Sequence, residues 1–213
     1  SEFKVIFWWE WTHRQLGRLI GLTILLPLIY FTIKNGLWVL KKYGIILFLI
    51  CLQGFFGWYM VSSGLIDRID VSHYRLSVHL VTAFFILSII FWKFLELTDV
   101  QINKTSFSLN IMKFFIFLIF LQLIIGAFVS GMDAGTVYNT WPLMGSSYFP
   151  DDSKFIDFFD ISFFNNPSIV QFIHRNLAYL ILGIYIYILF YVLKDCNEIF
   201  RKPMFIIGIS LFL

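Results

Sequence analysis

Three of the four histidines have the residue type and the position to do chemistry in an apolar environment. His13, His79 and His174 each stand near the start of a long apolar stretch, and His13 and His174 are each followed by an arginine. An ionisable side chain at such a place is costly in lipid and is by default a functional candidate. Because neutral imidazole is a common metal ligand, these histidines indicate a metal-binding site in a membrane.

Glu10 is the carboxylate closest in sequence to any of these histidines. It precedes His13 by three residues and Arg14 by four, so one helix face can bring Glu10, His13 and Arg14 together. The carboxylate could orient the imidazole or handle protons near a reacting group. The alternative is an ordinary helix-start carboxylate favoured by the helix dipole.

Arginines accompany each histidine. Arg14 and Arg175 directly follow a histidine, and Arg75 lies one helical turn before His79. A guanidinium suits bidentate binding of a carboxylate such as a heme propionate. The same side chains could equally extend to the membrane interface as structural anchors.

The elements that must position these groups are membrane helices. The chain is 59% hydrophobic and 14% charged, which leaves too few polar side chains to cover a soluble globule. Apolar segments of about 20 residues, the length that spans a bilayer, run over 15–33, 43–62, 76–95, 111–130 and 168–193, with a shorter run at 203–213. They lack the period-2 alternation of a membrane barrel. The predicted fold is an all-α polytopic transmembrane helical bundle.

Basic residues gather in alternate connections between these segments. They are Lys34, Lys41, Lys42, Lys93, Lys104, Lys113, Lys194, Arg201 and Lys202. The positive-inside rule puts these connections on the inner side, so the three histidines fall near the outer ends of their helices. The net charge of +3 is explained by this topology and requires no nucleic-acid partner.

The start of the chain and His73 are both predicted to lie in outer loops. His73 is then a solvated residue, the alternative being a labile third ligand.

Two helices that enter from the same side, each with an inward-facing histidine, can ligate one iron from opposite faces of a porphyrin. His13 and His79 are the predicted pair. Gly17 and Gly21 lie four and eight residues after His13, on the same face, where they leave room for a flat macrocycle. The alternative is a helix-packing GxxxG motif.

An internal repeat predicts a second site of the same kind. HRQLGRLIG, which begins at residue 13, aligns with HRNLAYLILG, which begins at residue 174, and LQGFFG at 52–57 aligns with LQLIIG at 121–126. By the spacing of the first pair, the partner of His174 would fall near position 240, beyond Leu213. We therefore expect the chain to be a piece of a longer protein, with one complete histidine pair and half of another.

Four motifs resemble those of the heme A synthases. They are EWTHR at 10–14 with Gly17, Arg18 and Gly21, VSHYRLSVHL at 71–80, GMDAG at 131–135 with YNTWPLM at 138–144, and VQFIHR at 170–175. The resemblance implies two similar four-helix bundles in the complete protein, of which this chain covers the second to the seventh helix. Residues 1–95 would form the amino-terminal bundle for substrate heme, 96–112 an inner linker, and 113–213 the carboxy-terminal heme b bundle.

The resemblance also implies an activity. Members of the family are heme-dependent oxidoreductases that oxidise a porphyrin methyl group of heme O to the formyl group of heme A, for cytochrome oxidase assembly. His13 and His79 match the ligands of the substrate heme, and His174 matches one ligand of heme b. Glu10 matches a carboxylate regarded as catalytic, and Arg14, Arg75 and Arg175 are expected to bind propionates.

Partners and location follow from the same resemblance. Heme O would arrive from a heme O synthase, the electron donor is not indicated, and membrane lipid and a homo-oligomer are expected partners. The location would be a bacterial cytoplasmic membrane or the mitochondrial inner membrane, with the heme sites toward the periplasmic or intermembrane side. The outer positions carry no cysteine, as in the cysteine-free subgroup of the family, and His73 stands where the family pattern has proline.

Two other classes remain open at this stage. A transmembrane diheme cytochrome b that only carries electrons would also need bis-histidine sites near one surface. A polytopic transporter or assembly factor could use the histidines as proton relays or packing residues.

Overall fold

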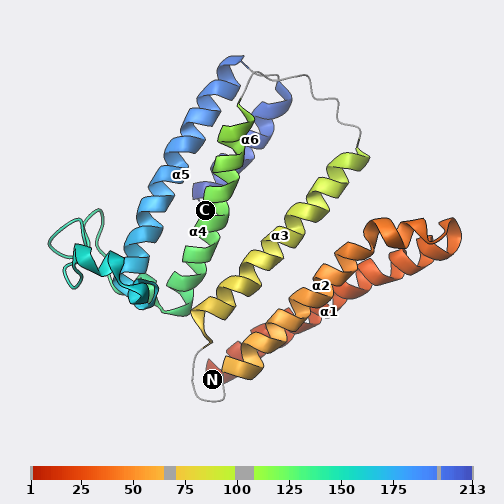
Figure 1. The fold of residues 1–213 in the computed structure, drawn as a ribbon, viewed down its shortest axis with the longest axis horizontal. Helices are drawn as coiled ribbons and strands as arrows, with labels where there is room; N and C mark the ends of the chain where they lie inside the picture. The colour runs from red at the N-terminus through yellow and green to blue at the C-terminus, as the bar shows by residue number, and fades with distance from the viewer. Residues whose placement is uncertain (1, 65–70, 99–107, 196–197, 213) are drawn as a thin grey trace. The chain divides into compact units, whose positions relative to one another are not determined.

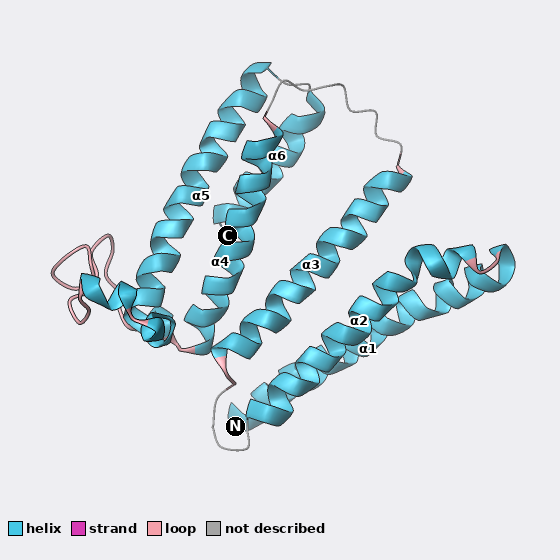
Figure 2. Ribbon diagram, viewed as in Figure 1, coloured by secondary structure: helices cyan, strands magenta, loops and turns pink. Residues whose placement is uncertain are grey.

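The computed structural model describes residues 2–64, 71–98, 108–195 and 198–212, and within these ranges every regular element is a helix (Figure 2). The α-helices are α1 Glu2–Asn35, α2 Trp38–Gly64, α3 His73–Leu97, α4 Leu109–Gly131, α5 Pro167–Asp195 and α6 Glu198–Phe212. Three short 3₁₀ helices, η1 Ala134–Thr136, η2 Phe155–Phe159 and η3 Ile161–Asn165, lie between α4 and α5. The predicted all-α fold is confirmed.

Five helices are long and apolar enough to cross a membrane, which confirms a multi-pass membrane protein. The spans are Phe7–Asn35, Trp38–Ser62, His73–Leu97, Leu109–Gly131 and Pro167–Lys194. Each contains one of the five predicted segments. The predicted shorter run at 203–213 lies largely in α6, whose 15 residues fall short of the ~20 needed to span a bilayer.

The predicted outer loop at the start of the chain is wrong, because α1 already begins at Glu2. Aromatic residues occupy the first turns of this helix, and Trp8 and Trp9 are exposed. Amphipathic aromatic rings are favoured where a helix leaves the hydrocarbon, so the helix can continue past its apolar segment without a break. α1 ends at a glycine turn: Gly36 has a φ of 97° and its N–H donates to the carbonyl of Thr32 at 2.9 Å.

The described helices belong to two compact units, each of which is described by itself. The first comprises Ser1–Ile69 and Thr82–Asp99, and the second Asp70–Val81 and Val100–Leu213. In the first unit α1 and α2 form an antiparallel hairpin, with Leu28, Val39 and Ile46 buried. The bundle division predicted at 95 and 113 stays a prediction.

The second unit has a continuous apolar core that α4, α5 and α6 share. Figure 1 labels these three helices. Its buried members are Phe115, Leu118, Leu177, Ile181, Tyr185, Ile188, Val192 and Met204. The Tyr185 hydroxyl donates to the carbonyl of Met204 at 2.8 Å, which satisfies the polar tip of this buried ring. This core holds α4 and α5 side by side. It therefore also determines which residues of α4 face the first turns of α5.

The start of α5 is encoded locally. The Asn166 side-chain oxygen accepts from the backbone N–H groups of Ser168 at 3.0 Å and Ile169 at 3.2 Å, and Pro167 occupies the first helical position. An asparagine cap followed by proline is a strong start signal, because the asparagine side chain accepts from N–H groups of the first turn and proline has no N–H to leave unpaired. The cap places His174 about two turns into the helix.

Candidate functional site

His174 lies between α5 and α4, where Gln122 faces it. The Gln122 side-chain nitrogen lies 3.3 Å from the imidazole Nε2 and also donates to the backbone carbonyl of His174 at 3.3 Å. Two polar atoms of this pair, Nδ1 of His174 and Oε1 of Gln122, are buried and have no hydrogen-bond partner among the described residues. Unpaired buried polar atoms are rare in proteins and indicate a place that a ligand or water completes.

Gly126 lets the imidazole approach the backbone of α4. A Cβ at this position would lie 3.1 Å from Cε1 of His174 and 3.8 Å from its Nδ1. The first separation is closer than ordinary van der Waals contact, so only glycine leaves the ring undisturbed. Gln122 and Gly126 are one helical turn apart and therefore share the α4 face that receives His174.

Arg175 is used by the loop between α4 and α5. Its two terminal nitrogens donate to the carbonyls of Thr140 at 2.9 Å and Tyr138 at 2.6 Å. Gln171, one turn earlier on α5, donates to the same Tyr138 carbonyl at 2.9 Å. These bonds fasten the YNTWPLM segment to the helix that carries His174. Arg175 thus has a structural role, and its binding to a propionate stays a prediction.

Two further contacts extend this attachment along α5. The Trp141 indole N–H donates to the Tyr179 hydroxyl at 2.7 Å, and the Tyr148 hydroxyl donates to the side-chain oxygen of Asn176 at 2.6 Å. The indole itself is 74% exposed. The loop is therefore anchored at several points near His174, and its motif residues serve first to hold it there.

Carboxylates of this loop are held as anions by neighbouring hydroxyl and N–H groups. The pKa of Asp151 is lowered, first because the Ser146 backbone N–H donates to it at 2.6 Å. Partial burial acts to raise the pKa of Asp152. Hydrogen bonds, above all from the Ser168 hydroxyl at 2.6 Å, outweigh this effect, so the pKa of Asp152 is lowered.

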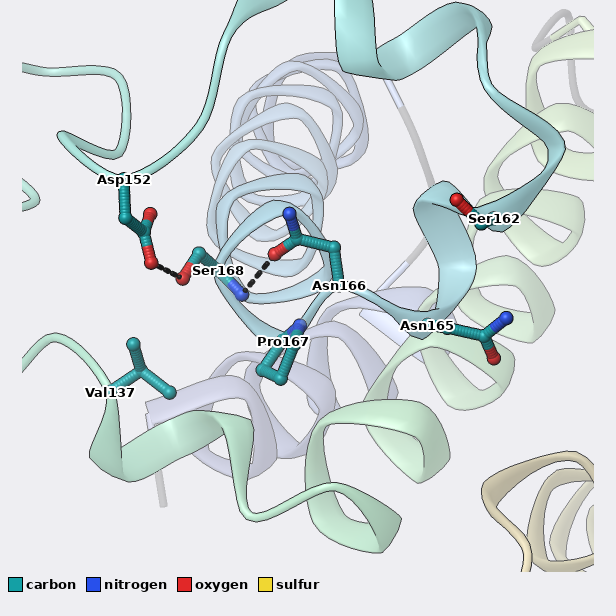
Figure 3. A pocket seen from close by; sticks show the side chains of 7 residues that line it. All are labelled: Val137, Asp152, Ser162, Asn165, Asn166, Pro167 and Ser168. Atoms are coloured by element: carbon teal, nitrogen blue, oxygen red, sulfur yellow. Dashed lines mark hydrogen bonds between the residues drawn. The ribbon is translucent and has the colours of Figure 1, made fainter.

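Asp152 and Ser168 line an open hollow (Figure 3) with Val137, Ser162, Asn165, Asn166 and Pro167. None of the predicted site residues lines that hollow.

His73 is not the solvated loop residue that the sequence predicted. It is the first residue of α3, and its half-buried ring packs edge-on against Phe128 of α4, with centroids 5.1 Å apart. A Cβ on Gly131 would lie 2.8 Å from both Cα and Cβ of His73, so the two helix ends are in direct contact. The first helical position suits proline, which accounts for the residue expected there from the family pattern.

In the first unit, Glu10 and Arg14 approach each other as their spacing predicted. The carboxylate and guanidinium are 3.7 Å apart on α1, and both side chains are exposed, so the pair contributes little to stability. Glu10 lies in the third turn of a helix that starts at Glu2, where the dipole effect has faded. The helix-start explanation of Glu10 is therefore wrong. Among the residues that the structure describes, nothing lies within 4 Å of a Cβ built on Gly17 or Gly21, so neither glycine is needed for packing against them.

The predicted partners His13 and His79 belong to different units, so their pairing stays a prediction. The roles of Arg14 and Arg75 toward a propionate stay predictions as well. Within the described ranges, no group of three or more His, Cys, Asp or Glu side chains gathers to hold a bare metal ion. An axial pair of histidines needs no such group, because a porphyrin itself supplies the four equatorial nitrogens.

Gln122 and Gly126 are the site residues that sequence reasoning missed. Their signal was present in the 121–126 segment, where a polar side chain and a glycine are separated by one turn inside an otherwise apolar helix. The repeat by itself assigns these two residues no role. A polar residue in a membrane span is itself a functional indication.

The fold and the site define a multi-pass helical membrane protein that holds a histidine and a glutamine against each other inside a helix pair. The chain belongs to the COX15-CtaA family of cytochrome oxidase assembly proteins, whose profile matches residues 1–213. No solved structure matches it.

Three curated relatives that it resembles are each named heme A synthase. The relative from Pelagibacter ubique is 51% identical over 184 residues, 85% of this chain and 55% of that protein. The Flavobacterium psychrophilum relative is 42% identical over 89% of this chain and 58% of its own length. The Rickettsia bellii relative is 42% identical over 99% of this chain and 65% of its own length. The chain thus spans between 55% and 65% of the length of these relatives.

Proposed function

We propose that this chain is part of a heme A synthase, which oxidises a methyl group of heme O to the formyl group of heme A. The observation that carries the proposal is the 51% identity, over 85% of the chain, to a relative of that name. The four motifs lie within residues 1–213, which the family profile matches throughout. The relatives' name favours this enzyme over a cytochrome b that only carries electrons.

The surroundings of His174 fit a heme ligand. Its Nδ1 and the Gln122 Oε1 are buried without partners in the described part of the chain, and Gly126 keeps one side of the ring clear. In this proposal His174 would be one of the residues that hold heme b. A bound heme would supply the redox chemistry.

Most of the residues proposed to act on the substrate lie on α1, and His79 lies on α3. His13, together with His79, binds heme O, and Gly17 and Gly21 leave open surface along α1 for the macrocycle. Glu10 orients His13 or transfers protons at the reacting edge, since its carboxylate is exposed and lies 3.7 Å from the guanidinium of Arg14, which is exposed as well.

The setting of this reaction belongs to the same proposal. The membrane is a bacterial cytoplasmic or a mitochondrial inner membrane, with both heme sites toward its outer side. The basic connections on the opposite side support that orientation. Heme O comes from a heme O synthase, and Arg14, Arg75 and Arg175 hold heme propionates at the outer surface.

The test is turnover by the full-length protein. Purified enzyme given heme O, a reductant and oxygen should yield hydroxylated and formylated heme in chromatography of the extracted pigment. Glu10→Gln should retain heme and lose most turnover, whereas Glu96→Gln, the same change in a helix-end carboxylate paired with Lys93, should leave turnover unchanged. Unmodified pigment in a protein that still transfers electrons would overturn the proposal in favour of the electron carrier.

A further inference from the structure

Gln122 makes two contacts to one residue, and together they fix the state of the imidazole. A carbonyl oxygen can only accept, so the bond to the His174 carbonyl requires that the amide nitrogen, not the amide oxygen, points toward it. That nitrogen carries two hydrogens and no lone pair. Its second contact, to Nε2 of His174 at 3.3 Å, is therefore favourable only when Nε2 is unprotonated.

The proton of the neutral ring must then sit on Nδ1. The opposite amide orientation would place two oxygens against each other at the carbonyl, so the orientation follows from chemistry and not from the choice of atom names. Nδ1 is buried, and a Cβ built on Gly126 would lie 3.8 Å from it, an ordinary contact, and 3.1 Å from the neighbouring Cε1. Gln122 and Gly126 thus approach one ring from a single helix face.

From these contacts we infer that Gln122 is a positioning residue that holds His174 in the tautomer with the proton on Nδ1, the one that could ligate iron through Nε2. The inference rests on the proposed function, in which His174 binds heme b. Nε2 has a single lone pair, so the Gln122 N–H must leave it when the metal binds. The bond to the backbone carbonyl can persist and keep the amide beside the ring. Without Gln122, the ring could adopt either tautomer and more than one orientation.

The first test reads the tautomer directly in the wild-type, heme-free, full-length protein. Nitrogen-15 NMR of labelled histidine distinguishes a protonated Nδ1 from a protonated Nε2 through their chemical shifts and couplings to ring hydrogens. His174, assigned by its loss in His174→Ala, should carry its proton on Nδ1. A proton on Nε2 would overturn the inference, and this measurement does not depend on the folding of a Gln122 variant.

The second test removes the donor while preserving volume. Gln122→Met should raise the share of His174 rings that carry the proton on Nε2 in the heme-free protein, and should shift the low-spin electron paramagnetic resonance signal that reports ring orientation when heme is bound. Gln53→Met, the same change in the aligned segment of α2, should leave both unchanged. An unchanged tautomer and signal in Gln122→Met would overturn the inference. Retention of all heme b by His174→Ala would instead overturn the proposed function.

Discussion

Replacing Gly126 with alanine tests whether the imidazole of His174 really lies against the backbone of α4. The added Cβ would stand 3.1 Å from Cε1, and ordinary contact begins near 3.4 Å, so the ring must move by a few tenths of an ångström. The ring is held by Gln122 on the same face and cannot retreat freely. Overpacking of this kind costs about 1–3 kcal/mol.

The helix propensity of alanine opposes part of that cost, so a matched control is needed. Gly183 lies in α5 with nothing within 4 Å of a Cβ built on it. Both substitutions gain about 1 kcal/mol of helix propensity, and only Gly126→Ala meets the ring. The difference between the two variants therefore isolates the contact and should be about 1–3 kcal/mol in the free energy of unfolding.

The assay is equilibrium unfolding of the full-length protein in detergent, followed by heme b content per polypeptide. We expect Gly183→Ala to match or exceed the wild type, and Gly126→Ala to be less stable than Gly183→Ala and to retain less heme b. If the two variants unfold alike and hold equal heme, the ring does not lie where the structure has it, and the reasoning is refuted.

Three further substitutions probe the frame around His174. Arg175→Lys should raise amide exchange across 138–144 by about tenfold or more, because two charge-assisted bonds to carbonyls are lost; unchanged exchange would show that the arginine does not hold the loop. The lowered pKa of Asp152 means that its anion stabilises the folded loop above the usual Asp pKa, and that this contribution disappears as the pH falls through the lowered value. Proteolysis of the loop should therefore increase in acid, by less in Asp152→Asn, and equal acid sensitivity would contradict the shift. Gly131→Ala should destabilise the protein more than Gly126→Ala in the same unfolding assay, because its Cβ would meet backbone and Cβ atoms of His73 at 2.8 Å; equal stability would argue against that packing.

Several elements could be read directly from the sequence because their causes are local. The start of α5 depends on Asn166 and Pro167, which are neighbours in the chain, and the approach of Glu10 to Arg14 depends only on a separation of four residues in a helix. The placement of His73 in a loop was wrong although a local signal was present. Ser72, a residue type favoured as a helix N-cap, directly precedes His73.

The sequence by itself determined the five membrane spans, the family and the identity of His174 as a ligand candidate, because hydrophobic length and motif order are properties of the chain read in one dimension. Only the tertiary structure decided that Gln122, 52 residues before His174, would face its imidazole. It also decided that Arg175 would hold loop carbonyls. Such pairings depend on which faces of two helices meet, and that choice is made by the shared apolar core of α4, α5 and α6 rather than by either helix alone.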